Sequence, residues 1–283
     1  MLPKNTSVGP VSLVVPDLKK SQRFYEDVLG FKTLAETATT LHLGASDDTP
    51  LLILTENKNG IKPNRRSPGL FHFAILFPTR SSLGKAAIHL SEAGWHLSGA
   101  GDHLVSEALY LEDPDGNGIE LYADRPRETW KFQGGQVLMD TLSVDLQSIA
   151  ADAKADPTPY TGLPAGTTMG HVHLKVANLE AAKHFYEDLI GFDEMTSMPQ
   201  ALFVAAGGYH HHLGLNTWMS SGSNPPAENS LGLLGFTINL PSNDDLAAIV
   251  ARLTSSGVKV ESTSNGAFVR DPSHNGVFLT VAA

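Results

Sequence analysis

The feature that most constrains the fold is an internal repeat. The letters FYEDVLGF at 24–31 return as FYEDLIGF at 185–192, each time after a short apolar run. Asp17 and Asn178 stand where a helix N-cap belongs, and a glycine follows each helical segment, as is typical of a left-handed helix end. Both copies therefore predict an apolar strand that leads into a helix, followed by further short strands.

A second pair of segments has the same order with less sequence identity. The patterns predict strand, helix, strand and strand at 69–78, 82–94, 107–111 and 118–123, and again at 232–241, 244–257, 267–270 and 276–281. An Asp-Pro turn precedes the last strand of each, at Asp113 and Asp271. We therefore predict an α+β chain of four βαβββ modules.

The four modules divide into two halves around a stretch rich in small residues and proline. We expect an N-terminal domain at 1–126 with modules one and two, and a C-terminal domain at 169–283 with modules three and four. The segment 127–168 is interpreted as a linker that holds one helix near 145–153.

The composition of the chain excludes several partners and several kinds of catalytic and metal site. The net charge of −10 and the lack of a basic cluster argue against nucleic acid as a partner. The chain has no cysteine, which excludes disulfides, thiolate metal sites and cysteine catalysis, so its 12 histidines are the remaining route to a transition metal. We also expect a cytoplasmic protein without a membrane partner, because neither a signal peptide nor a membrane span is evident.

Glu120 is the first candidate for chemistry. It lies between Ile119 and Leu121 on an apolar strand, where a buried carboxylate is costly without a partner. A metal or another cation would satisfy it, and the alternative is an edge strand with Glu120 in water. His103 and Tyr110 precede it in the same stretch.

His72 lies inside a continuous apolar strand and opens the module that Glu120 closes. The first and last strands of such a unit can be close, so the two side chains could meet; the alternative is an ordinary core histidine. His171 occupies the corresponding place at the start of the third module, and His173 shares its face of the strand.

A run of three histidines, His210 to His212, is assigned to a strand at 210–217, in which His210 and His212 would point one way and His211 the other. The alternative is a polar edge strand with hydrogen-bonded imidazoles. Two histidines and one carboxylate form the facial triad that suits Fe(II), although Zn and Mn accept the same ligands.

These residues resemble a known family. The pattern Gly101-x-His103-x5-Leu109-Tyr110-x2-Asp113-Pro114-x-Gly116-x3-Glu120 resembles the extradiol ring-cleavage dioxygenase motif of the vicinal oxygen chelate superfamily. The segments YADRP at 122–126 and GGYHHH at 207–212 look more narrowly like bacillar-type catechol 2,3-dioxygenases. The resemblance covers nearly the whole chain and implies two vicinal oxygen chelate (glyoxalase/bleomycin-resistance/dioxygenase) domains with cupped mixed sheets.

The resemblance also implies the site and the reaction. His72, Glu120 and His171 would bind Fe(II), with Mn(II) as the alternative metal. Tyr110 and His103 would hydrogen-bond substrate or oxygen, and His211, with His212 as the alternate, would serve as the acid–base group. The substrates would be an aromatic diol of the catechol type and O2, and the product a 2-hydroxymuconic semialdehyde.

One departure from the family bears on how the modules pair. Most extradiol enzymes take their ligands from the third and fourth modules, but Gly235 and Phe278 stand here where His72 and Glu120 align. The first module offers Pro10 in place of a ligand. We therefore expect the second and third modules to pair around the metal, and the first and fourth to pair without ligands.

Three alternatives stay open from the sequence. A glyoxalase-like metal-dependent isomerase or lyase could draw a fourth ligand from the histidine run. A non-enzymatic module of the same fold could bind an aromatic compound, and a hydroquinone-cleaving relative would differ only in substrate. The preferred ring substituents stay open too, as does homo-oligomer formation.

Overall fold

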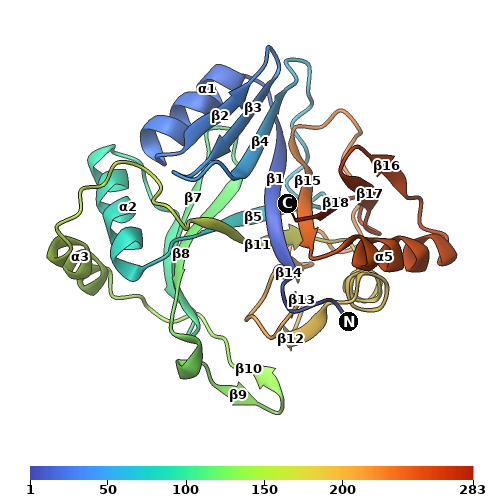
Figure 1. Ribbon diagram of the computed structural model, residues 1–283. Helices are drawn as coiled ribbons and strands as arrows, with labels where there is room; N and C mark the ends of the chain where they lie inside the picture. The colour runs from blue at the N-terminus through green and yellow to red at the C-terminus, as the bar shows by residue number, and fades with distance from the viewer. Residues whose placement is uncertain (283) are drawn as a thin grey trace. The chain divides into compact units, whose positions relative to one another are not determined.

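The computed structural model describes residues 1–282 of the 283, and in them the strands form two eight-stranded sheets and one small hairpin (Figure 1). The order in the first sheet is β16 (Glu261–Thr263), β17 (Gly266–Arg270), β18 (Gly276–Val281), β15 (Gly232–Leu240), β1 (Ser7–Val15), β4 (Pro50–Glu56), β3 (Thr40–Gly44) and β2 (Lys32–Glu36). In the second it is β12 (Asp193–Met198), β13 (Ala201–Ala205), β14 (Leu213–Asn216), β11 (Thr168–Lys175), β5 (Gly69–Leu76), β8 (Gly118–Asp124), β7 (Ser106–Glu112) and β6 (Gly99–Asp102). The hairpin consists of β9 (Phe132–Gln133) and β10 (Gln136–Val137).

The strand order agrees with the module pairing expected from the sequence. Strands of the fourth and first modules follow one another in the first sheet, and strands of the third and second modules in the second sheet. The prediction of an α+β fold built from four βαβββ modules is confirmed.

The repeated FYED segments begin as α-helices and end as π-helices. Helix α1 (Leu18–Arg23) runs into η1 (Phe24–Val28), and α4 (Leu179–Lys183) runs into η3 (His184–Ile190). The expected caps are present, because Asp17 accepts a hydrogen bond from the Lys20 N–H and Asn178 accepts one from the Ala181 N–H. The sequence predicted ordinary helices here and gave no sign of the π-helical turns.

By its contacts the chain forms two compact units. One comprises Val15–Lys58 and His72–Met169, and the other comprises Met1–Val14, Asn59–Phe71 and the chain from Gly170 onward. The division at 126 and 169 that the sequence suggested stays a prediction.

In the first-named unit, helix α3 (Leu146–Ala155) packs against α2 (Arg80–Glu92), as Figure 1 shows. This confirms the single helix expected in the linker, while the 3-10 turn η2 (Arg127–Thr129) and the β9–β10 hairpin in the same stretch were not foreseen. The two helices approach closely at Gly84, where an added Cβ would lie 2.5 Å from the carbonyl oxygen of Ile149. A residue with a side chain would force them apart.

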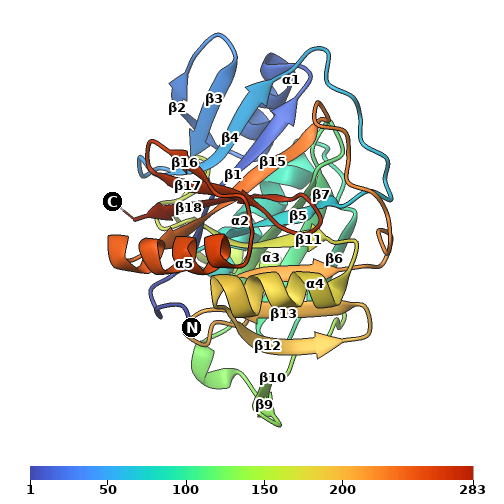
Figure 2. The ribbon, with the colours of Figure 1, turned by 90° about the vertical axis from the view of Figure 1, so that its right-hand side faces the viewer.

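In the other unit, the repeated modules each contain one pair of parallel strands. Strand β11 runs parallel to β14, and β15 runs parallel to β18. Helix α4 packs against β13 and β14, while α5 (Asn243–Ser255) packs against β15 and β18 (Figure 2). Each helix thus covers the strands of its own module, as the amphipathic pattern of the sequence requires.

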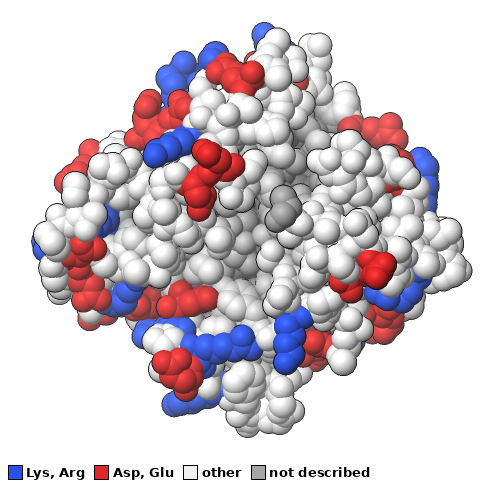
Figure 3. Space-filling view, viewed as in Figure 1, with Lys and Arg blue, Asp and Glu red and all other residues white. Residues whose placement is uncertain are grey.

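Charged residues of both signs are interspersed on the face drawn in Figure 3, where most of the visible surface belongs to uncharged residues. Within residues 1–282, no helix is long and apolar enough to cross a membrane.

Valine at position 84 should destabilise the protein by about 1–3 kcal/mol, because the packed α2–α3 contact has no room for a side chain. Urea unfolding of Gly84→Val measures this. Ser91→Val, on the exposed face of the same helix, is the control and should change the free energy of unfolding by no more than about 0.5 kcal/mol. Equal unfolding midpoints for the two variants would contradict the close packing.

Candidate metal centre

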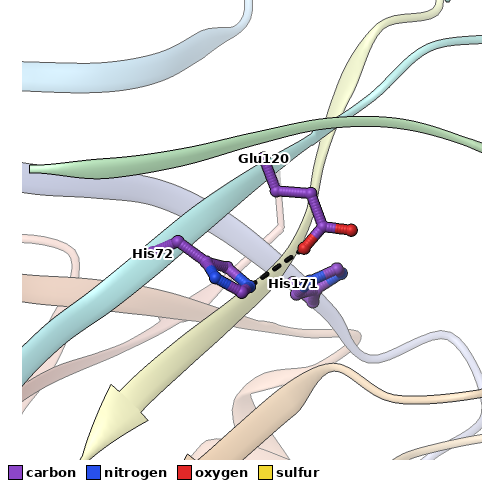
Figure 4. A group of neighbouring side chains, drawn as sticks. All are labelled: His72, Glu120 and His171. Carbon is purple, nitrogen blue, oxygen red and sulfur yellow. Dashed lines mark ion pairs between the residues drawn. The ribbon is translucent and has the colours of Figure 1, made fainter. Parts of the chain in front are cut away.

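His72 and Glu120 meet as the sequence suggested they could. Strands β5 and β8 are parallel neighbours, with Ala74 opposite Glu120 in the register. Since His72 lies two residues before Ala74, it presents its ring on the same face as the glutamate. The Nε2 atom of His72 lies 2.9 Å from Oε2 of Glu120, and both side chains are buried (Figure 4).

His171, on β11, completes a group of three. One ligand atom of each of His72, Glu120 and His171 lies within 4.8 Å of the others. Figure 4 shows the two imidazole rings and the carboxylate directed toward one another. Two imidazole nitrogens and a carboxylate oxygen are a donor set that a divalent transition metal accepts, so the residues fit the ion that the sequence led us to expect.

Tyr110 connects Glu120 to His103. Tyr110 lies opposite Glu120 across strands β7 and β8, and its hydroxyl lies 2.6 Å from Nε2 of His103. The Nδ1 atom of His103 lies 3.0 Å from the carbonyl oxygen of Asp140. Since a carbonyl only accepts, Nδ1 carries the proton, and the Nε2 atom of a neutral His103 accepts from the tyrosine hydroxyl.

Burial, and then the negative charge of Glu120, raises the pKa of Tyr110 far above its usual value. The hydroxyl therefore remains protonated at neutral pH. Tyr110 and His103 form one hydrogen-bonded chain that ends beside the carboxylate of Glu120.

The histidine run differs from the prediction. Strand β14 begins at Leu213, so the three histidines lie in the turn before it and not in a strand. Gly207 and Gly208 have φ angles of 63° and 69°, and these two left-handed residues turn the chain after β13. The side chains of the three histidines therefore do not alternate between two faces, as they would in a strand. Instead, the Nδ1 atoms of His210 and His211 lie 2.7 Å apart.

His211 and His212 have different surroundings. The ring of His211 lies against that of His171, with centroids 4.1 Å apart. His212 uses Nδ1 to accept a hydrogen bond of 3.1 Å from the Ala206 N–H. Burial, and then its histidine neighbours His210 and His171, lowers the pKa of His212 to about 3, so this ring stays neutral.

Comparison with known proteins identifies the family. The model of the Glyoxalase/Bleomycin resistance protein/Dioxygenase superfamily matches residues 7–121 and 168–278. The chain belongs to this superfamily. The resemblance to the vicinal oxygen chelate fold is thereby confirmed.

Individual relatives agree with this membership. The chain is 43% identical over 281 residues to the catechol-2,3-dioxygenase of Bacillus subtilis (strain 168), covering 98% of this chain and 97% of that protein. It is 29% identical over 134 residues to biphenyl-2,3-diol 1,2-dioxygenase 3 of Rhodococcus globerulus, covering 45% and 70% of the two chains. The crystal structure of glyoxalase I from Zea mays has a TM-score of 0.60 at 17% identity, covering 98% of this chain and 92% of that one, and shows the shared fold.

The fourth module of this superfamily member is an apolar copy of the site. Phe278 has the place of Glu120, because it faces Phe268 across β17 and β18 as Glu120 faces Tyr110 across β7 and β8. A Cβ at Gly235, the counterpart of His72, would lie 2.9 Å from Cε2 of Phe278. The phenylalanine ring thus occupies the space that a histidine at this position would need.

A set of aromatic residues beside the histidines was not anticipated from the sequence. His173 contacts Phe71, Phe203 and Trp218, with ring centroids 5.0, 5.6 and 5.4 Å away. Its Nε2 lies 3.0 Å from the side-chain nitrogen of Asn216. The shared face of His171 and His173 was the available signal, but the partners lie 30 or more residues away along the chain.

Proposed function

We propose that this enzyme opens the ring of catechol or a substituted catechol beside its two hydroxyls, with O2 as the oxidant and Fe(II) as the metal. The observation that carries the proposal is the buried group of His72, Glu120 and His171, in a chain 43% identical over nearly its full length to an enzyme named catechol-2,3-dioxygenase. The product would be a 2-hydroxymuconic semialdehyde. We also infer a cytoplasmic location, as expected from the sequence.

In this proposal the three residues hold the metal. Fe(II) bound there would supply open positions for both hydroxyl oxygens of the diol and for O2. Glu120 contributes the single negative charge of the set, and its buried position gives a divalent cation a strong electrostatic advantage. Mn(II) would fit the same donors and is the alternative metal.

The remaining residues handle protons and orientation. The diol must lose protons to bind as an anion, and His211, whose ring lies tilted beside that of His171, is the proposed base. His212 is less suited, because burial and its histidine neighbours lower its pKa to about 3, too low for the ring to take up a proton at neutral pH. The hydroxyl of Tyr110 would turn its one proton from Nε2 of His103 to negative charge that develops on oxygen during the reaction.

A reconstitution experiment tests the function. Protein loaded anaerobically with Fe(II) receives catechol, air is admitted, and the near-ultraviolet absorbance and O2 uptake are recorded. The proposal expects one O2 to be consumed per ring opened. Protein loaded with Fe(II) should be active, and so should protein loaded with Mn(II). An isomerase would instead need Zn or Ni and consume no O2, and an aromatic-binding module would give no product. Either outcome would overturn the proposal.

Glu120→Gln should lose metal and activity together, because it removes the charge from the ligand set. Metal affinity should fall by more than about 100-fold, since even residues outside the ligand set contribute about 10–100-fold. Metal content after gel filtration and O2 uptake measure the two effects, and His72→Ala should behave alike. Glu112→Gln, an exposed carboxylate on the adjacent strand, is the control. Full metal content in Glu120→Gln would refute the ligand assignment.

His211→Phe should keep its metal but turn over about 10²–10⁴-fold more slowly, the range typical of a lost acid–base group. His96→Phe introduces the same side chain at an exposed histidine and should match the wild type. Steady-state O2 uptake together with metal analysis separates turnover from metal loss. Unchanged turnover of the metal-loaded His211→Phe protein would rule out the proposed base.

A further inference from the structure

The chain anchors two hairpin turns in the same way. The hydroxyl of Tyr25 donates to Oδ2 of Asp113 at 2.8 Å, and the hydroxyl of Tyr186 donates to Oδ2 of Asp271 at 3.0 Å. Both tyrosines are fully buried, and both aspartates are almost so. The two bonds join equivalent residues of the internal repeat, and one lies in each half of the chain.

Each aspartate also closes its own turn. Oδ1 of Asp113 accepts from the backbone N–H groups of Asp115 and Asn117 at 2.9 and 2.8 Å, while the Asn117 amide donates to Oδ2 at 2.8 Å. Asp271 accepts the corresponding three bonds from Ser273 and Asn275 at 2.8, 2.9 and 2.9 Å. In both turns the tyrosine is the donor that ties the turn to the helix of another module.

The π-helical turns explain how the tyrosines reach these carboxylates. Tyr25 lies in η1 and Tyr186 in η3. Phe24 and Tyr25 are sequence neighbours, yet both are buried, as are Phe185 and Tyr186. A π-helical turn holds more residues than an α-helical turn, so it lets two successive side chains face the core; such turns are rare and are often found at functional sites.

The two anchored hairpins differ in the residues they carry. On the β7–β8 hairpin, Tyr110 precedes Asp113 by three residues, and its cross-strand partner Glu120 follows Asn117 by three. On the β17–β18 hairpin the same two positions hold Phe268 and Phe278, whose rings pack with centroids 4.8 Å apart. One anchor therefore supports a metal-ligand candidate and its hydrogen-bonding neighbour, and the other supports an apolar pair.

We propose that Tyr25 is a positioning residue for the metal centre, which acts by fixing through Asp113 the hairpin that carries Glu120 and Tyr110. The inference rests on the proposed function. Tyr25 does not belong to the ligand set, and it acts through Asp113, which precedes Glu120 by seven residues. Burial, and then the charge of Asp113, raises the pKa of Tyr25, so its hydroxyl remains a donor across the working pH range.

The physical reason is the precision that a metal ligand needs. A ligand set must be held to within about 0.5 Å by supporting contacts. Without the tyrosine hydroxyl, the buried carboxylate of Asp113 loses one of its four hydrogen bonds, the one that ties the turn to η1, and the turn relaxes away from that helix. Because the strands beyond the turn follow it, Glu120 shifts against His72. The same relaxation beside Phe278 moves only a packed ring.

The repeat supplies its own matched control. Tyr25→Phe and Tyr186→Phe each remove one oxygen atom and one buried hydrogen bond to an aspartate. Both should lower the melting temperature of the metal-free protein by similar amounts. The Fe(II) dissociation constant, measured by competition with a chelator, should rise about 10–100-fold in Tyr25→Phe and stay near the wild-type value in Tyr186→Phe. Turnover at saturating Fe(II) should fall in Tyr25→Phe, with a smaller change in KM.

Equal Fe(II) affinities in the two variants would overturn the inference while leaving the proposed function intact. Should Tyr25→Phe fail to fold, Asp113→Asn and Asp271→Asn form a second matched pair with the same expectation. A wild-type protein that binds Zn(II) but not Fe(II) would refute the proposed function, and the same comparison made with Zn(II) would still test the positioning role. A wild-type protein that binds neither metal would refute both.

Discussion

The buried contact between His72 and Glu120, with 2.9 Å between Nε2 and Oε2, is the interaction on which the rest of this structure depends. A carboxylate this deeply buried on an apolar strand is destabilising unless charge and hydrogen bonds compensate it. The imidazoles of His72 and His171 and the hydroxyl of Tyr110 surround it, and a divalent cation would complete the compensation. The site and the fold therefore impose one requirement, namely that the first and last strands of a module lie side by side.

Duplication shows which parts of the module serve the fold and which serve the site. The capped helix, the π-helical turn, the buried tyrosine and the Asp-Pro turn are present in both halves. The polar pair Tyr110 and Glu120 is present in one, and phenylalanines replace it in the other. The hairpin scaffold thus forms with either pair, and only the copy in the second module carries the ligand candidate Glu120.

The sequence predicted much of this because the repeat could be aligned with itself. Alignment placed His72 and His171 at equivalent strand positions and showed that Gly235 and Phe278 stand where ligands would be needed in the fourth module, while the family resemblance implied the ligand set itself. The motif around Glu120 added the identity of the family.

Other features could not be read from the pattern. The π-helical turns bury two adjacent aromatic residues, and the helical pattern of one apolar residue every 3.6 positions does not predict this. The three histidines look like a strand, but the left-handed pair Gly207 and Gly208 places them in a turn. The pairing of His173 with Asn216 joins positions 43 residues apart, and local sequence holds no information about such a contact.

The most direct measurement is a crystal structure of the Fe(II)-loaded protein with diffraction data on both sides of the iron absorption edge. The account predicts one anomalous peak about 2.0–2.2 Å from a ring nitrogen of His72, a ring nitrogen of His171 and a carboxylate oxygen of Glu120, the usual range for metal bonds to such atoms. A peak bound by other residues, or none at these three, would contradict it.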